Sequence, residues 1–454
     1  MNRPSHSFRY PLEEAFGRIF TPFERFLRRT TAGGIILIGT TLITLLIANS
    51  PWGVAFHHLW ERSLALSLGN WRLEMTLHHW VNDGLMALFF LLVGLEIKRE
   101  ILVGELARPR DAVLPIVGAM GGFLVPALIY SAFNADGPAA AGWGIPMATD
   151  IAFAVGILVL LAWRIPHAIL VFLAALAIVD DLGAVLVIAL FYTEGIDTSA
   201  LISGAVLLAV LVLLNRSGIR HPMPYALAGV FLWYFVLLSG LHATLSGILL
   251  AFCIPALPSS RPQQFDERLR DLGAAFRAEI RDPNGRDSPL SNERMATIAA
   301  GVQEAALAVQ APLQRMEHGL NPWVGFLVIP LFALANAGID FAAIDLGQSI
   351  TAPVTLGVMF GLVVGKFVGI GGACWLAVRL GFARLPPKVG WRHLLGTACL
   401  GGIGFTMSLF ISNLAFTDDR LVEEAKLGIL LGSLVAAMIG LVWLLIATRT
   451  KSAH

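Results

Sequence analysis

Two adjacent carboxylates, Asp180 and Asp181, lie in the middle of the apolar run 173–190, which contains no basic residue. One ionised carboxylate at the centre of a membrane helix costs roughly 2.5–3.5 kcal/mol. Two neighbouring ones also repel each other, so we expect each to take up a proton, a cation or a lysine partner. Successive helix residues point about 100° apart, so the two carboxylates would face different surroundings. The pair indicates ion exchange within a membrane; the structural alternative is a packed ion-pair cluster without a transport role.

Lys366 is the only basic residue inside an apolar run away from its ends. A lysine at that depth cannot easily reach water and usually needs a carboxylate. Asp180 or Asp181 is the obvious partner, and the residues alone do not decide between them.

Two further segments combine a helix breaker with polar side chains. In 144–150, Pro146 removes a backbone donor, and Thr149 and Asp150 follow in an apolar context. In 400–408, Gly401, Gly402 and Gly404 precede hydroxyl residues that include Thr406. Both segments predict interrupted helices whose unwound backbone lines a cavity, since such backbone is tolerated at membrane depth only there. Close helix packing through small residues is the alternative for the glycine segment.

Composition predicts an all-α polytopic membrane protein. The chain has 454 residues, 56% hydrophobic composition and only 14% charged residues, against about 25% charged residues in a soluble domain. A net charge of +1 excludes a nucleic-acid-binding surface. The three cysteines lie in or beside apolar runs and show no disulfide or zinc spacing, so we expect no cofactor.

About 20 apolar residues cross a bilayer, and twelve runs qualify. They are 32–50, 81–103, 111–132, 143–162, 167–192, 199–214, 222–239, 241–256, 322–341, 352–378, 393–416 and 427–447. Of the 32 Lys and Arg residues, only Arg62, Arg72, Arg420 and Lys426 fall in the odd-numbered loops. The positive-inside rule therefore predicts that both termini are cytoplasmic.

The remaining segments complete the predicted organisation. Residues 1–30 predict a cytoplasmic amphipathic N-terminus before transmembrane helices 1–8 in 31–256; a merely basic tail that orients the chain is the alternative. Within the first outer loop, alternation around Gly69-Asn70 predicts a β-hairpin at about 62–76, which would pair with a second copy. Residues 257–321 predict a cytoplasmic insertion with two surface helices, broken at Pro283-Asn284-Gly285. Transmembrane helices 9–12 occupy 322–447, and 448–454 form a cytoplasmic tail.

The two interrupted spans are the fourth and the eleventh, so they are the middle members of spans 3–5 and 10–12. Interruptions at corresponding positions of two halves indicate a transporter built from repeats. Seven spans separate the triplets, so the repeats would be inverted and the two discontinuous helices would cross near mid-membrane.

Several motifs together resemble the NhaA family of bacterial Na⁺/H⁺ antiporters, an established example of inverted repeats. The resemblance runs from about residue 30 to 447. The motifs are Ala148–Ala154, Ala177–Ala184, Asn82–Ala87, Gly94–Glu100, Gly365-Lys366 and Gly402–Ser408.

The resemblance implies an electrogenic antiporter of the bacterial inner membrane. It would export Na⁺ or Li⁺ in exchange for entering protons by alternating access, serve pH and sodium homeostasis, and form a dimer through the outer hairpin. Asp181 would be the main residue that exchanges Na⁺ and protons. Asp180 would pair with Lys366, and Asp180 and Thr149 would add Na⁺ ligands. Asp150 would offset the positive ends of the broken helices, and Lys366 the negative ends.

The resemblance also implies a pH-response region and activation at alkaline pH. The matching residues are Glu96, Lys98, Arg99, Glu100, Glu317, His318 and His242. The chain departs from the best-known pattern at Gln314 and Asn321, which leaves the pH of activation open. An exposed loop histidine is the plain interpretation of His318.

Two other functions are compatible with buried aspartates. A Na⁺-coupled solute symporter of related fold would also have broken helices, but the central Lys366 disfavours it. An intramembrane aspartyl protease needs its two aspartates on separate, facing helices, and Asp180 and Asp181 are consecutive. Cleavage of a transmembrane peptide would identify the protease.

Overall fold

The computed structural model describes residues 30–449 except 70, 194, 282–291 and 342–344. Residues 1–29 of the predicted amphipathic N-terminus, the break at 283–285 and residues 450–454 of the predicted tail lie outside the described residues. The chain forms two compact units, each described here by itself. Unit 1 comprises residues 1–86, 104–192 and 322–454, and unit 2 comprises 87–103 and 193–321.

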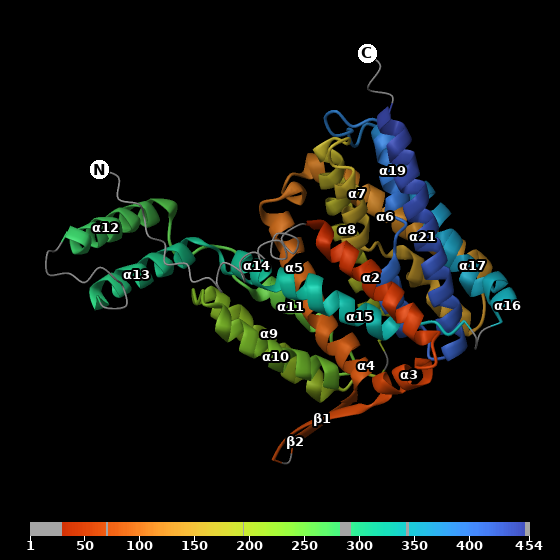
Figure 1. The fold of residues 1–454 in the computed structure, drawn as a ribbon, viewed down its shortest axis with the longest axis horizontal. Coiled ribbons are helices and arrows are strands. Elements are labelled where there is room, and N and C mark those ends of the chain that lie inside the picture. The colour runs from red at the N-terminus through yellow and green to blue at the C-terminus, as the bar shows by residue number, and fades with distance from the viewer. Residues whose placement is uncertain (1–29, 70, 194, 282–291, 342–344, 450–454) are drawn as a thin grey trace, which may run out of the picture. The chain divides into compact units, whose positions relative to one another are not determined.

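Unit 1 contains one small antiparallel sheet and many helices (Figure 1). The strands β1 (Ser63–Leu68) and β2 (Trp71–Thr76) pair with Leu68 opposite Trp71, and Gly69 adopts a φ of 60° in the turn. The predicted hairpin is confirmed. The first helices of unit 1 are α2 (Thr30–Ala48), α3 (Gly53–Glu61), α4 (Leu77–His79) and the π-helix η1 (Trp80–Leu85).

The middle of unit 1 consists of η2 (Glu105–Ala107), α6 (Pro109–Phe133), the 3₁₀-helix η3 (Pro138–Met147), α7 (Ile151–Leu160) and α8 (His167–Phe191). Its last part consists of the π-helix η4 (Val324–Val328), α15 (Ile329–Asn336), α16 (Leu346–Thr351), α17 (Pro353–Phe360), the π-helix η5 (Gly361–Gly365), α18 (Lys366–Arg379), α19 (Trp391–Leu400), α20 (Phe405–Ala415) and α21 (Asp419–Arg449). The helix α6 packs against α18, and α21 packs against α17 and α19. The α6–α18 contact joins the two predicted triplets, and the contacts of α21 lie within the second of them.

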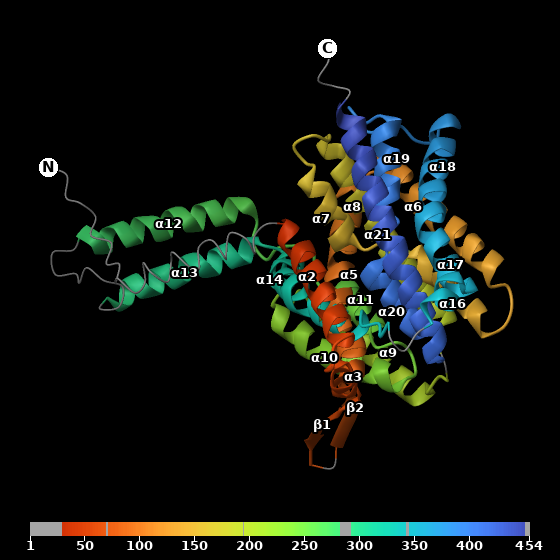
Figure 2. The same cartoon turned by 45° about the vertical axis from the view of Figure 1, so that its right-hand side comes forward.

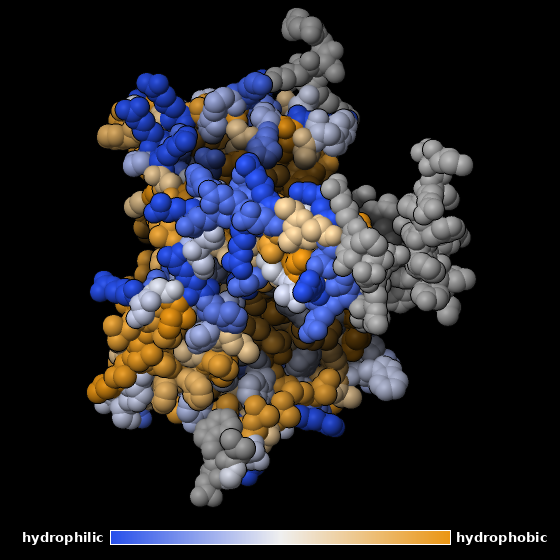
Figure 3. Space-filling model, turned by 90° about the vertical axis from the view of Figure 1, so that its left-hand side faces the viewer, coloured by the Kyte–Doolittle hydropathy of each residue, from blue (hydrophilic) through white to orange (hydrophobic). Residues whose placement is uncertain are grey.

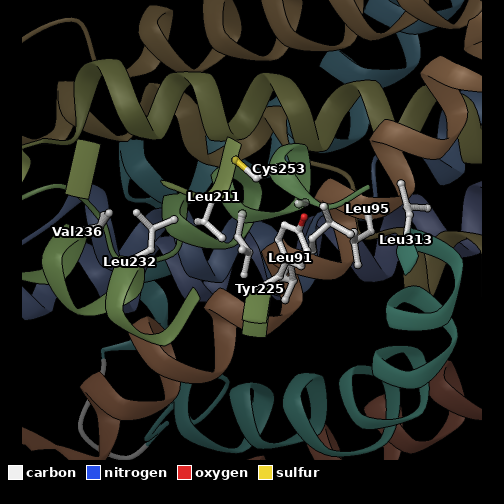
Figure 4. Close-up of a cluster of buried hydrophobic side chains, with 11 residues drawn as sticks. Leu91, Leu95, Leu211, Tyr225, Leu232, Val236, Cys253 and Leu313 are labelled. Atoms are coloured by element: carbon white, nitrogen blue, oxygen red, sulfur yellow. The ribbon is translucent and has the colours of Figure 1, made fainter. Parts of the chain in front are cut away.

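Unit 2 contains α5 (Met86–Leu102), α9 (Thr198–Arg216), α10 (Pro222–Leu238), α11 (Leu245–Cys253), α12 (Pro262–Arg281), α13 (Glu293–Val309) and α14 (Pro312–Trp323). The first residue of α5 and the last two residues of α14 belong to unit 1. Its core joins α5, α9, α10, α11 and α14 around Tyr225 (Figure 4). The two helices predicted in the insertion are present as α12 and α13, which lie side by side (Figure 2).

Seven helices of the described chain are long and apolar enough to cross a membrane, and two bent helix pairs raise that number to nine. The protein is therefore a mostly helical, multi-span membrane protein. Each of the twelve predicted ranges contains a helix or a broken helix. The count of twelve stays a prediction, because α5, α10 and α11 have only 17, 17 and 9 residues.

The hydrophobic surface agrees with a membrane setting. On the face shown in Figure 3, hydrophobic residues gather mainly in the lower part, below a broad hydrophilic area, and α9 exposes Ile202, Val206 and Leu213. Helices satisfy their backbone hydrogen bonds internally, which is what lipid demands.

The helix that contains the ninth predicted span has different bounds. The span is predicted at 322–341, whereas the helical segment runs from Pro312 to Asn336, and the membrane limits of this span stay a prediction. Residues 314–321 are mostly polar, so a hydropathy criterion stops at the end of the apolar run although the helix continues.

Candidate functional site

The two interrupted helices are broken where predicted, and the breaks contact each other. In the first, η3 ends at Met147, Ala148 and Asp150 have extended backbones, and α7 begins at Ile151. In the second, α19 ends at Leu400 and α20 begins at Phe405, with a bend of 45°. The backbone N–H of Asp150 donates to the carbonyl of Ile403 across 2.6 Å. Backbone groups freed by one break are thus satisfied by the other.

Asp150 caps the starts of two half-helices. Its Oδ1 accepts from the N–H of Phe153 in α7 at 3.0 Å. Its Oδ2 accepts from the N–H and the hydroxyl of Thr406 in α20 at 3.0 and 2.6 Å. Helix N-termini carry partial positive charge, so one carboxylate complements both ends.

The glycines of the second break leave space that a side chain would fill. A Cβ at Gly402 would lie 2.3 Å from the carbonyl oxygen of Leu362, and one at Gly404 would lie 2.9 Å from that of Ala148. A Cβ at Gly401 would lie 2.8 Å from Ile370. Pro146 is buried near the end of η3. Gly404 therefore permits the close approach of the two breaks, and Gly401 and Gly402 permit the close approach of the second break to η5 and α18.

A buried ion pair lies beside the crossing. Lys366 Nζ donates to Asp180 Oδ2 at 2.6 Å and to Thr149 Oγ1 at 3.0 Å, and the side chains of Lys366 and Asp180 are both 0% exposed. Thr149 Oγ1 also lies 2.5 Å from Asp180 Oδ2 and 2.8 Å from the carbonyl oxygen of Gly401. The structure therefore places Lys366 with Asp180, one of the two partners that the residues left open.

Close helix packing positions Lys366. Where α6 crosses α18, a Cβ at Gly121 would lie 2.1 Å from the carbonyl oxygen of Gly369. Small residues let the two backbones approach in this way. The π-helix η5 ends immediately before Lys366, and such turns are frequent at functional sites.

The ring of Phe123 covers the ammonium group of Lys366, with 5.8 Å from Nζ to the ring centroid. A Cβ at Gly183 would lie 2.0 Å from the same ring. Sequence reasoning missed Phe123, since one phenylalanine among many in an apolar run carries no signal.

All five predicted ion-site residues come from unit 1. Thr149, Asp150, Asp180, Asp181 and Lys366 are each at most 1% exposed. Among the described residues, no group of three or more His, Cys, Asp or Glu side chains could hold a metal ion. A cation here would therefore need hydroxyl and carbonyl oxygens beside the carboxylates, which are ligands that hard cations accept.

The predicted pH-response residues lie in unit 2, and the structure brings some of them together. Arg99 donates to Glu317 at 2.6 Å and to Glu100 at 3.1 Å. Lys98 donates to the carbonyls of Phe252 (2.8 Å) and Ile254, at the end of α11.

The other three residues take different places. Glu96 is half-buried one turn before Glu100 on α5, and His318 is exposed next to Glu317. His242 lies in the turn before α11, at the opposite end of that helix from the carbonyls that Lys98 contacts.

Comparisons with known proteins agree with this architecture. The family model for Na⁺/H⁺ antiporter 1 matches residues 24–444. The chain is 61% identical to the Na⁺/H⁺ antiporter NhaA of Syntrophobacter fumaroxidans over 98% of this chain and 94% of the relative. It is 59% identical to the NhaA of Acidithiobacillus ferrooxidans, over 95% of this chain and 99% of the relative.

A third relative, NhaA 1 of Saccharophagus degradans, is 51% identical over 95% of this chain and 93% of the relative. The family model and these relatives are all Na⁺/H⁺ antiporters, which excludes the protease alternative. The chain belongs to the NhaA family of Na⁺/H⁺ antiporters.

Proposed function

We propose that this protein exchanges Na⁺ for H⁺ at the buried carboxylates where the two broken helices cross. The observation that carries the proposal is the combination of Asp180 and Asp181 at 0% and 1% exposure with the hydroxyl of Thr149 and backbone carbonyls released by the breaks. These are oxygen ligands of the kind that Na⁺ accepts. Family membership and relatives named as Na⁺/H⁺ antiporters support the same function.

Competition for one anion couples the two ions. Asp181 holds either Na⁺ or a proton, and each of them neutralises it. The neutralised site reorients between the two faces of the membrane, whereas a bare charge at this depth is costly to move. Exchange follows because neither ion passes unless the other returns.

The Lys366–Asp180 pair gives a route to a second proton. When Na⁺ binds the carboxylates, it competes with Lys366 for Asp180 Oδ2, which Lys366 holds at 2.6 Å. A lysine that loses its counter-ion in a buried site favours its neutral form. Release of that proton beside the one from Asp181 moves net charge per cycle, so that the membrane potential drives Na⁺ export. Li⁺, a smaller cation with the same ligand preference, would use the same site.

The proposed setting is the bacterial inner membrane, with twelve spans in two inverted triplets and both termini in the cytoplasm. The distribution of basic residues supports this orientation. The Arg99–Glu317–Glu100 cluster would then lie on the cytoplasmic side and provide the alkaline activation, so that the protein serves pH and sodium homeostasis.

We also propose a dimer through the outer hairpin. Leu64 and Leu66 of β1 are 47% and 48% exposed, and a two-stranded sheet alone is marginal in water. Deletion of 63–76 should convert dimers in detergent to monomers; unchanged mass by light scattering would contradict this contact.

The test of function is Asp181→Asn in everted vesicles with a fluorescent ΔpH dye. Addition of Na⁺ should release the proton gradient with the native chain and fail to do so with the variant at every pH from 6.5 to 9. The matched control is Asp197→Asn, because Asp197 is an exposed helix cap and Asn caps equally well.

Near-native exchange by Asp181→Asn would end the assignment. A response to Na⁺ that requires an added organic solute would instead favour the symporter.

A further inference from the structure

Four polar side chains from four elements of unit 1 meet around one amide. They are His78 of α4, Asn82 of η1, Asn336 of α15 and Asn413 of α20. Asn336 is 1% exposed and lies at the centre. Its Oδ1 lies 2.6 Å from Asn413 Nδ2 and 2.9 Å from His78 Nε2.

The hydrogen-bonding pattern fixes the orientation of this amide. Asn336 Nδ2 donates to the carbonyl of Phe332 and to Asn82 Oδ1, both at 2.9 Å. Its Oδ1 must then face the donors, which are the amide of Asn413, an Nε2–H of His78 and, more distantly at 3.4 Å, the amide of Asn82. A buried network with all of its strong contacts made specifies one arrangement of the helices that carry it.

The Asn413–Asn336 bond joins two different classes of helix. The helix α20 follows the second break and belongs to the triplet of spans 10–12. By contrast, α4, η1 and α15 lie outside both triplets. Asn413 is therefore the member of the cluster that the ion-site helices contribute.

The helix α20 is held at both ends. Thr406 at its start is bound by Asp150, and Asn413 follows seven residues later. Seven residues are about two turns, so the two contacts lie on the same side of one rigid rod of eleven residues. A shift at Asn413 is thereby transmitted to the crossing of the broken helices.

Resting on the antiport proposed above, we propose that Asn336 and Asn413 are positioning residues that form a latch closing the outer end of the transporter. In the proposed topology this cluster lies at the outer ends of spans 9 and 11 and at the start of span 2. Alternating access in inverted-repeat transporters is largely the rocking of one bundle against the other around a fixed site. Opening the outer end moves α20 away from α15, so the Asn413–Asn336 bond breaks in the outward-open state and favours the inward-open one.

The test is Asn413→Leu, a change of similar volume at a half-buried position. The apparent KM for Na⁺ is measured at the inner face in everted vesicles and at the outer face in right-side-out vesicles. Each apparent KM equals the intrinsic constant of the site divided by the fraction of transporters open to that face. The ratio of inner to outer KM therefore reports the conformational equilibrium. Loss of one net hydrogen bond should raise this ratio roughly two- to tenfold.

The matched control is Ser412→Ala, on the same helix. Ser412 Oγ donates to the carbonyl of Leu409 within α20, so its loss should leave the KM ratio unchanged. A merely structural role of Asn413 would lower the maximal rate and leave the ratio at the native value, and that result overturns the latch. Absence of exchange by the native chain would instead refute the antiport function.

Should Asn413→Leu fail to fold, Asn413→Ser, which shortens the donor, replaces it with the same expected direction. A native ratio there would likewise overturn the proposal.

Discussion

Removal of Asp180 should expose how strongly Lys366 depends on it. In Asp180→Asn, Lys366 keeps the hydroxyl of Thr149 at 3.0 Å and loses the carboxylate at 2.6 Å. Breaking a buried ion pair by removing one partner costs about 3–5 kcal/mol. The cost has an upper bound, because Lys366 can instead give up its proton.

That bound depends on pH. An ordinary lysine has a pKa of about 10.4, so holding it neutral costs about 4.6 kcal/mol at pH 7 and about 1.9 kcal/mol at pH 9. We therefore expect Asp180→Asn to destabilise the protein by about 3–4.5 kcal/mol at pH 7 and by no more than about 2 kcal/mol at pH 9. At about 2 °C per kcal/mol for a large chain, the apparent Tm should fall by about 6–9 °C at pH 7 and by less than about 4 °C at pH 9.

The assay is thermal unfolding in detergent, followed by tryptophan fluorescence at both pH values. Asp197→Asn serves as the exposed control and should show the native Tm. The double variant Asp180→Asn/Lys366→Met removes both charges and should recover most of the loss, since replacing both members of a buried pair is often neutral. An equal fall in Tm at both pH values, or a double variant no more stable than the single one, would refute the charge argument.

Two further predictions concern packing and pH. Gly369→Ala should lower the Tm and abolish exchange, because its Cβ would lie 2.2 Å from the carbonyl oxygen of Gly121. Gly372→Ala on the same helix should leave the Tm and the exchange unchanged, because a Cβ there would have nothing within 4 Å. Similar Tm values for the two variants would contradict the close helix crossing. Burial, and then the positive charges of His79, Lys426 and His57, lower the pKa of His78 below 6.5 despite its hydrogen bond to Asn336. The unfolded chain then binds more protons than the folded one, so the free energy of unfolding should fall as the pH drops through about 6.5. His78→Gln, which keeps a donor but cannot be protonated, should flatten the dependence of Tm on pH between 7 and 5.5, and an unchanged slope would contradict it.

The charged part of the site was predictable because charge in an apolar run is costly and therefore conspicuous. Asp180, Asp181 and Lys366 stand out for this reason, and Pro146 with Gly401, Gly402 and Gly404 locates the breaks. The residues alone left the partner of Lys366 open between Asp180 and Asp181. The family resemblance implied Asp180, and Lys366 pairs with Asp180 in the structure.

Neutral polar residues were not predictable in the same way. Asn82, Asn336 and Asn413 are separated by as many as 331 positions, and a single asparagine near a helix end is unremarkable by itself. The π-helix at Gly361–Gly365 was missed for a related reason, since its glycines fit close packing equally well. The early start of α14 was missed because its first turns are polar.

The double role of Asp150 has a consequence for how this chain can change. The segments 148–150 and 401–404 belong to opposite halves of the molecule, yet their spacing is set by the two oxygens of one side chain. Lengthening either segment by one residue would rotate the helix after it by about 100° and withdraw one amide from that carboxylate. The two connections are therefore expected to keep their lengths jointly, while the α12–α13 insertion is free to grow or shrink.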